Sequence, residues 1–165
     1  MARLRTDPVL EARRQWEAHG WTEAAPGMAA VTSVMRTQQI MLARVDAVLR
    51  PYDLTFARYE LLMLLHFSRS GALPLTSAST RLQVHPTSVT NVVDRLEAAG
   101  LVRRTPHPTD GRARLVEITL DGHALASKAT DALNEQVFVD PGLAASAVEQ
   151  LVSTLTEFRH AADDF

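Results

Sequence analysis

The sequence predicts a mainly α-helical fold with one small β-hairpin. Apolar residues recur at spacings of three and four through most of the 165 residues, which is the pattern of amphipathic helices. Residues 101–119 alternate instead, and the stretch 106–111 in their middle carries turn residues that fit neither a helix nor a central strand. Two helical segments joined by a short turn precede this hairpin. That order predicts a winged helix-turn-helix.

Composition limits the class of protein. A hydrophobic content of 46% with 22% charged residues is typical of one globular domain that buries a core. No apolar run approaches the roughly 20 residues of a membrane span, and the first residues lack the order of a signal peptide. We therefore expect a cytoplasmic location and no membrane partner. The absence of cysteine excludes disulfides, thiolate metal ligands and a cysteine nucleophile.

The N-terminal part, residues 1–27, is predicted to be an extension helix. Asp7 is expected to cap a helix over residues 7–19, and Pro26 and Gly27 are expected to break the chain after it.

Two further parts, residues 28–50 and 120–165, are predicted to form dimerisation helices. In the second part, Asp121 is expected to cap a helix that runs to about residue 139. Residues 144–162 carry an apolar stripe close to a heptad repeat. Such a stripe on a terminal helix needs a partner surface, which favours a homodimer.

Between these parts, residues 51–119 are predicted to form the winged helix-turn-helix lobe, continuous with the rest of the domain. A buried helix over 54–67 is followed by a short helix at 76–82 and a longer one at 86–99.

The helix at 86–99 is the candidate recognition helix. His85 is its predicted N-cap, and its apolar residues fall on one face. The polar residues that point elsewhere are the candidate DNA contacts: Thr87, Ser88, Thr90, Asn91 and Arg95. Asn91 has the geometry to pair bidentately with adenine, and threonine methyl groups can touch the thymine methyl. Taken alone, this face also fits an ordinary solvated helix surface.

The net charge of −2 is unevenly distributed. Residues 81–114 hold six arginines against three acidic residues, a local balance of +3, so the rest of the chain carries −5. Attraction to phosphate depends on the facing patch. Arg112 and Arg114 are therefore predicted DNA contacts at the hairpin. Arg103 and Arg104 are neighbours on one strand, so at most one of them faces DNA.

Over nearly its whole length the chain resembles the MarR family of bacterial transcription regulators. The matching residues are Leu54-Thr55, the stretch Ser88–Val102, and the stretch Asp110–Thr119 followed by Gly122. This resemblance implies a homodimer built from the N- and C-terminal helices that binds a palindromic operator in double-stranded DNA. It also implies a repressor that a small, often aromatic or anionic, ligand releases from DNA.

The resemblance also assigns individual residues. Arg112 matches the wing tip, and Asp110 would brace the wing, with Arg95 as a possible partner. The N-terminal extension looks like that of the urate-type sensors, in which a tryptophan lines the ligand pocket, and Trp16 is the matching residue. The alternative for Trp16 is an anchor that docks the extension on the body of the protein.

The histidines and the remaining motifs keep other functions open. No two of the six histidines lie three or four apart, so no helix presents the paired imidazoles of a metal site. His66 is either a core histidine or part of a ligand pocket. We expect no catalysis and no cofactor, because neither a serine–histidine–acid order nor a glycine-rich phosphate loop occurs. The alternatives are a metal-responsive regulator on the same scaffold and a winged helix used for protein contact.

Overall fold

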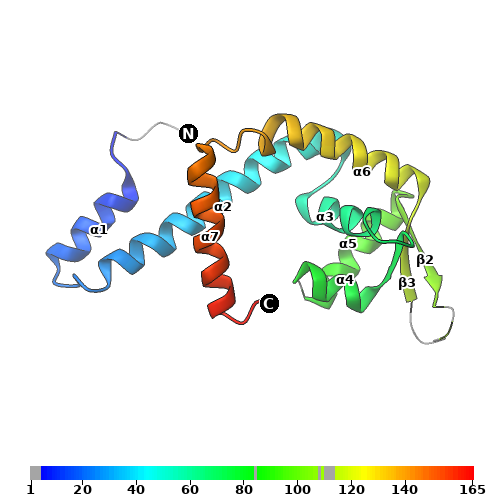
Figure 1. The fold of residues 1–165 in the computed structure, drawn as a ribbon, viewed down its shortest axis with the longest axis horizontal. Helices are drawn as coiled ribbons and strands as arrows, with labels where there is room; N and C mark the ends of the chain where they lie inside the picture. Colours follow the sequence, from blue (N-terminus) through cyan, green and yellow to red (C-terminus); the bar gives the residue numbers. More distant parts are fainter. Residues whose placement is uncertain (1–4, 84, 108, 110–113) are drawn as a thin grey trace. The chain divides into compact units, whose positions relative to one another are not determined.

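The structure is a computed structural model that describes residues 5–83, 85–107, 109 and 114–165 (Figure 1). The chain forms two compact units, Met1–Glu60 and Leu61–Phe165. Among the described residues, no helix has the length and apolar character that crossing a membrane requires.

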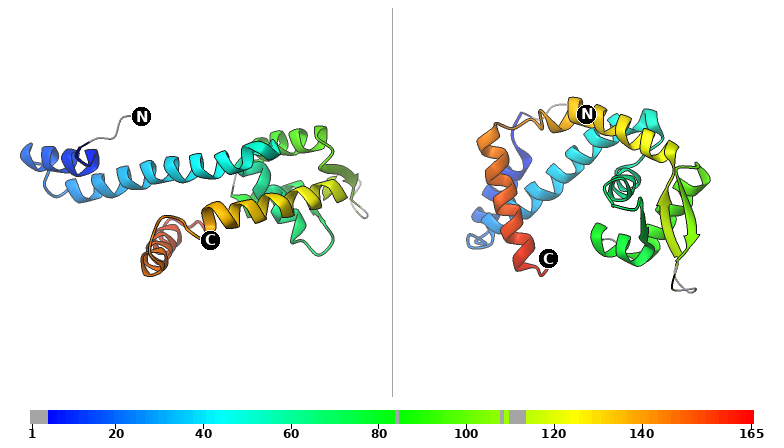
Figure 2. Two further views of the ribbon diagram at one scale, coloured as in Figure 1. Left: turned by 90° about the horizontal axis from the view of Figure 1, so that it is seen from above. Right: turned by 45° about the vertical axis from the view of Figure 1, so that its right-hand side comes forward.

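The first unit is a helical hairpin followed by a single tight turn. It contains α1 (Pro8–Ala18), α2 (Ala25–Leu49) and the 3-10 helix η1 (Arg50–Tyr52). The Asp7 carboxylate accepts a hydrogen bond from the Val9 amide at 2.8 Å, so the predicted cap of α1 is confirmed. Figure 2 shows α1 beside the first turns of α2.

The predicted break at Pro26 and Gly27 is wrong. The helix begins at Ala25, three residues before the predicted start, and the Met28 amide donates to the Ala24 carbonyl at 2.9 Å. Proline is tolerated in the first turn because the amide it lacks has no partner within the helix there. A Pro-Gly pair therefore does not end a helix when it lies at its beginning.

The second unit combines the helix-turn-helix, a three-stranded sheet and two C-terminal helices. The α3 helix (Phe56–His66) runs into it from the first unit. Its remaining elements are β1 (Ala72–Pro74), α4 (Leu75–Leu82), α5 (Pro86–Ala98), β2 (Val102–Pro106), β3 (Arg114–Ile118), α6 (Leu120–Leu133), the π-helix η2 (Asn134–Phe138) and α7 (Ala145–Ala161).

The sheet confirms the predicted hairpin and adds a strand. The strand order is β1-β3-β2 and both pairings are antiparallel. In β3, Val116 lies opposite Leu73 of β1 on one side and Arg104 of β2 on the other. Strand β1 was not predicted, because it has only three residues and ends in Pro74. Proline is compatible with a strand at the edge of a sheet, where β1 lies.

The core of the second unit lies between α3, α5 and the sheet. Its fully buried side chains include Leu61, Leu62, Leu65, Val89, Val93, Leu96, Val102 and Val116. The apolar face predicted for the helix at 86–99 therefore packs inward, while α5 contacts both α4 and β2. Each such side chain stabilises the fold by about 1.5–3 kcal/mol relative to an exposed one.

The predicted cap of the helix after the hairpin needs correction. Thr119, not Asp121, caps α6, because its hydroxyl oxygen accepts from the Gly122 amide at 3.0 Å. The same hydroxyl lies 2.8 Å from the carbonyl oxygen of Gly100, to which it donates. Thr119 therefore links the end of β3 to the turn after α5 as well as starting α6.

Candidate nucleic-acid interface

The helix-turn-helix consists of α4 and α5, joined by a turn in which Gln83 adopts a left-handed conformation with φ of +53°. The His85 ring nitrogen Nδ1 accepts from the Thr87 amide at 3.3 Å, which confirms His85 as the N-cap of α5. The helix ends before Gly100, whose φ of +72° lies in the region that glycine favours. Both ends of α5 are therefore fixed by local sequence.

The outward face of α5 carries the predicted base contacts. Thr87, Ser88, Asn91 and Arg95 are exposed, and Thr90 is half-buried at the edge of this face. Their side chains are short except for that of Arg95, so a partner surface can approach the helix backbone closely. This arrangement suits entry of α5 into a major groove.

Within the wing, the structure describes both strands, β2 and β3. Arg114 opens β3 opposite Pro106 and is exposed. Arg112 and Asp110 lie outside the described residues. The wing-tip role of Arg112 and the pairing of Asp110 with Arg95 therefore stay predictions.

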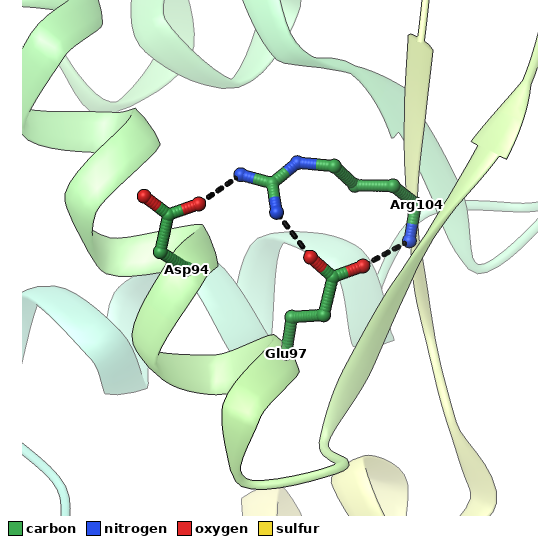
Figure 3. Close-up of polar contacts among 3 residues, drawn as sticks. All are labelled: Asp94, Glu97 and Arg104. Carbon is green, nitrogen blue, oxygen red and sulfur yellow. Dashed lines mark hydrogen bonds and ion pairs between the residues drawn. The ribbon is translucent and has the colours of Figure 1, made fainter.

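Instead, the described residues contain a different brace between α5 and the wing (Figure 3). Nη2 of Arg104 on β2 lies 2.5 Å from Oδ1 of Asp94, and Nη1 of Arg104 pairs with the Glu97 carboxylate. Glu97 also accepts from the Arg104 backbone amide at 2.9 Å. Burial works to lower the pKa of Arg104, but its bonds to Asp94 and Glu97 together outweigh burial and raise it. This cluster fixes the last turns of α5 to the wing.

A second ion pair crosses the wing itself. Arg103 and Glu117 are directly opposite each other on β2 and β3, and two guanidinium nitrogens reach the carboxylate at 3.1 and 2.7 Å. The hydrogen bond and charge of Arg103 lower the pKa of Glu117, and the same contacts raise the pKa of Arg103. Both arginines of β2 are thus paired with carboxylates of the fold.

Sequence reasoning missed these partners, although a signal exists. Asp94 and Glu97 are three residues apart and so share one side of α5, and Arg104 follows seven residues after Glu97. Within the part of the chain that the structure describes, Arg81, Arg95 and Arg114 form no ion pair and are exposed. Within the basic stretch 81–114, these three arginines are cations that phosphate can reach.

The two candidate ligand residues lie in different units. Trp16 is half-buried and packs edge-on against Trp21, with ring centroids 5.2 Å apart. Both rings line a hollow at the turn from α1 to α2, together with Glu23. In the second unit, His66 Nδ1 lies 2.9 Å from Nδ1 of His123, a contact that the sequence spacing did not indicate.

Comparison with known proteins identifies the family. A model of the MarR family matches residues 54–113. The chain is 49% identical to Sco5413, a MarR family transcriptional regulator from Streptomyces coelicolor, with a TM-score of 0.78. That match covers 85% of this chain and 97% of Sco5413. The chain belongs to the MarR family. The predicted fold class, mainly α with a winged helix-turn-helix, is confirmed by the same match.

Two further relatives have lower sequence identity to the chain. The chain is 34% identical over 84 residues to YhbI, an uncharacterized HTH-type transcriptional regulator from Bacillus subtilis. This match covers 51% of the chain and 53% of YhbI, so the chain spans about half the length of the curated relatives it matches. Sco3205 from Streptomyces coelicolor, solved in complex with DNA, is 23% identical with a TM-score of 0.70, over 80% of this chain and 84% of Sco3205. At this identity the match supports the fold alone.

Proposed function

We propose that this MarR family protein is a sequence-specific, DNA-binding transcriptional regulator located in the cytoplasm. The observation that carries the proposal is that α5 is amphipathic. Val89, Val93 and Leu96 are buried against the lobe, whereas Thr87, Ser88 and Asn91 are exposed on the outside. In this proposal α5 enters the major groove.

The two parts of the interface have different tasks. The short side chains of α5 contact base edges, with Asn91 as a bidentate partner for adenine. Arg81 and Arg114 contact backbone phosphates on either side of α5, and Arg112 reaches the minor groove from the wing tip. Affinity then comes mainly from the arginines, and sequence preference comes mainly from α5.

The regulator acts as a homodimer on a palindromic operator. In support, α2 exposes Val31, Val34 and Met35, and α7 exposes Val152 and Phe158. Large exposed apolar side chains gathered on single helices indicate a protein partner. A two-fold dimer would place two recognition helices about 34 Å apart, one turn of DNA.

The dimer is a repressor that a small aromatic ligand releases. Trp16 and Trp21 both line the hollow at the turn from α1 to α2, and aromatic rings of this kind suit an aromatic ligand. A ligand bound there would favour a spacing of the two lobes that does not fit the operator.

The test is binding to DNA from immediately upstream of the protein's own gene. Fluorescence anisotropy at fixed salt should give a dissociation constant at least about a thousandfold lower for this fragment than for random DNA of equal length. Equal affinity for both fragments would refute sequence-specific recognition. Absence of binding at low salt would favour the protein-contact alternative.

A further inference from the structure

Two histidines that are distant in the sequence meet in the second unit. His66 is the last residue of α3, and His123 lies in the first turn of α6. Their Nδ1 atoms are 2.9 Å apart, their ring centroids are 4.9 Å apart, and the ring planes are inclined by 61°. Both side chains are half-buried. The proposed interaction with DNA makes no use of this pair.

The short contact couples the hydrogen positions of the two rings, because which ring donates depends on the tautomer. One Nδ1 carries the hydrogen and donates it, while the other offers its lone pair. If the donating ring carries its hydrogen on Nε2 instead, both Nδ1 atoms offer a lone pair, and these two atoms lie 2.9 Å apart. Two neutral imidazoles with neighbouring free nitrogens form a chelating pair for a metal ion.

We propose that His66 and His123 bind a late first-row transition-metal dication of square-planar or octahedral preference, such as Ni²⁺ or Cu²⁺. Metal–nitrogen bonds of about 2.0–2.1 Å to two atoms 2.9 Å apart subtend an angle of about 90° at the metal. That is the angle between adjacent ligands in square-planar and octahedral complexes. A tetrahedral zinc site would require the nitrogens to lie about 3.3 Å apart.

Water completes the coordination. Over the described ranges, His, Asp and Glu side chains do not gather in groups of three or more that hold a metal. Imidazole is a ligand that suits Ni²⁺ and Cu²⁺, and both ions accept several waters.

Because the two histidines lie on different helices, a bound ion would affect the structure of the second unit. His66 ends the helix that precedes β1, and His123 follows the end of β3 by five residues. The His123 amide donates to the Thr119 carbonyl at 2.9 Å, so its backbone is held by the cap of α6. A bound ion would link α3 to α6 next to the base of the wing and stabilise the second unit.

The experiment is a calorimetric titration of the untagged full chain with NiCl₂ at neutral pH. We expect one Ni²⁺ per chain and a higher Tm in its presence, because a ligand that binds the folded state stabilises it. The variants are His66→Asn and His123→Asn. The asparagine amide reaches the position of Nδ1 and preserves a hydrogen bond to the remaining histidine, but it provides no imidazole nitrogen.

Each variant should bind Ni²⁺ at least about tenfold more weakly, since one of two protein ligands is lost. The matched control is His160→Asn, which removes an exposed histidine of α7 and should leave affinity unchanged. Circular dichroism identifies variants that retain the fold. Undiminished affinity in folded His66→Asn and His123→Asn proteins, or no binding by the wild type at millimolar Ni²⁺, would overturn the proposal. Both results are independent of DNA binding.

Discussion

Gly122 lies where the first turn of α6 passes close to the chain before β2, and we expect Gly122→Ala to destabilise the protein strongly. A Cβ atom at this position would lie 2.1 Å from the Leu101 carbonyl oxygen and 2.7 Å from Cγ1 of Ile118. The carbonyl belongs to the backbone and cannot rotate away like a side chain. Either α6 or the segment at Leu101 must move.

The expected loss of unfolding free energy in Gly122→Ala follows from the contacts that this movement breaks. The Leu101 carbonyl accepts from the Thr119 amide at 3.0 Å and, at 3.1 Å, shares the hydrogen of the Thr119 hydroxyl with the Gly100 carbonyl. Losing two hydrogen bonds costs about 2 kcal/mol, and crowding of Ile118 adds about 1 kcal/mol. A loss of about 3 kcal/mol lowers the Tm of a protein of this size by about 6–12 °C.

The assay is thermal unfolding followed by circular dichroism at one fixed protein concentration, because the Tm of the proposed homodimer would depend on concentration. Gly27→Ala is the matched control. Gly27 lies in the first turn of α2, and a Cβ there meets nothing within 4 Å. The same substitution should stabilise that helix by up to about 1 kcal/mol. A Tm of Gly122→Ala within about 2 °C of the wild type would refute the steric argument.

Three further predictions concern the interface. Asn91→Ala should cost about 1–3 kcal/mol of binding free energy on the operator and nothing on random DNA, and equal losses on both would exclude base reading. Arg114→Ala should reduce the slope of log affinity against log salt by about 0.9, and an unchanged slope would exclude a phosphate contact. Arg103 lowers the pKa of Glu117, so the charged Glu117 should make the wild type more stable than Glu117→Gln. This difference in unfolding free energy should have its full size above the ordinary glutamate pKa of 4.5. The difference should disappear as the pH falls through the lowered pKa of Glu117. Denaturant unfolding of both proteins at several pH values measures it. A difference that persists in acid would contradict the ion pair between Arg103 and Glu117.

Local sequence was sufficient to predict most of the helices and the hairpin, but not the start of α2 or strand β1. The start of α1 and both ends of α5 depend on contacts within a few residues, made by Asp7, His85 and Gly100. The sequence around each of these residues therefore predicts where the helix begins or ends. The cap of α6 was predicted wrongly because Asp121 and Thr119 are both good capping residues. The contact of Thr119 with Gly100, 19 residues away, favours the second.

Contacts between distant segments were not predictable in the same way. A metal site on one helix is indicated by histidines one turn apart, whereas His66 and His123 meet across 57 residues. Likewise, the pairing of Arg103 with Glu117 depends on the register of the hairpin, which periodicity alone does not fix. For these contacts, the relative placement of the elements determines which side chains meet.

That placement changes how the local charge of +3 acts in DNA binding. Arg103 and Arg104 belong to ion pairs inside the wing and its junction with α5, so they maintain geometry and contribute less to the attraction of phosphate. The exposed cations Arg81, Arg95 and Arg114 come from α4, α5 and β3. Because they come from three elements, the orientation of the helix-turn-helix toward the wing determines whether they engage DNA together. Breaking the Arg104 brace should therefore weaken DNA binding, although Arg104 itself contacts no phosphate in this scheme.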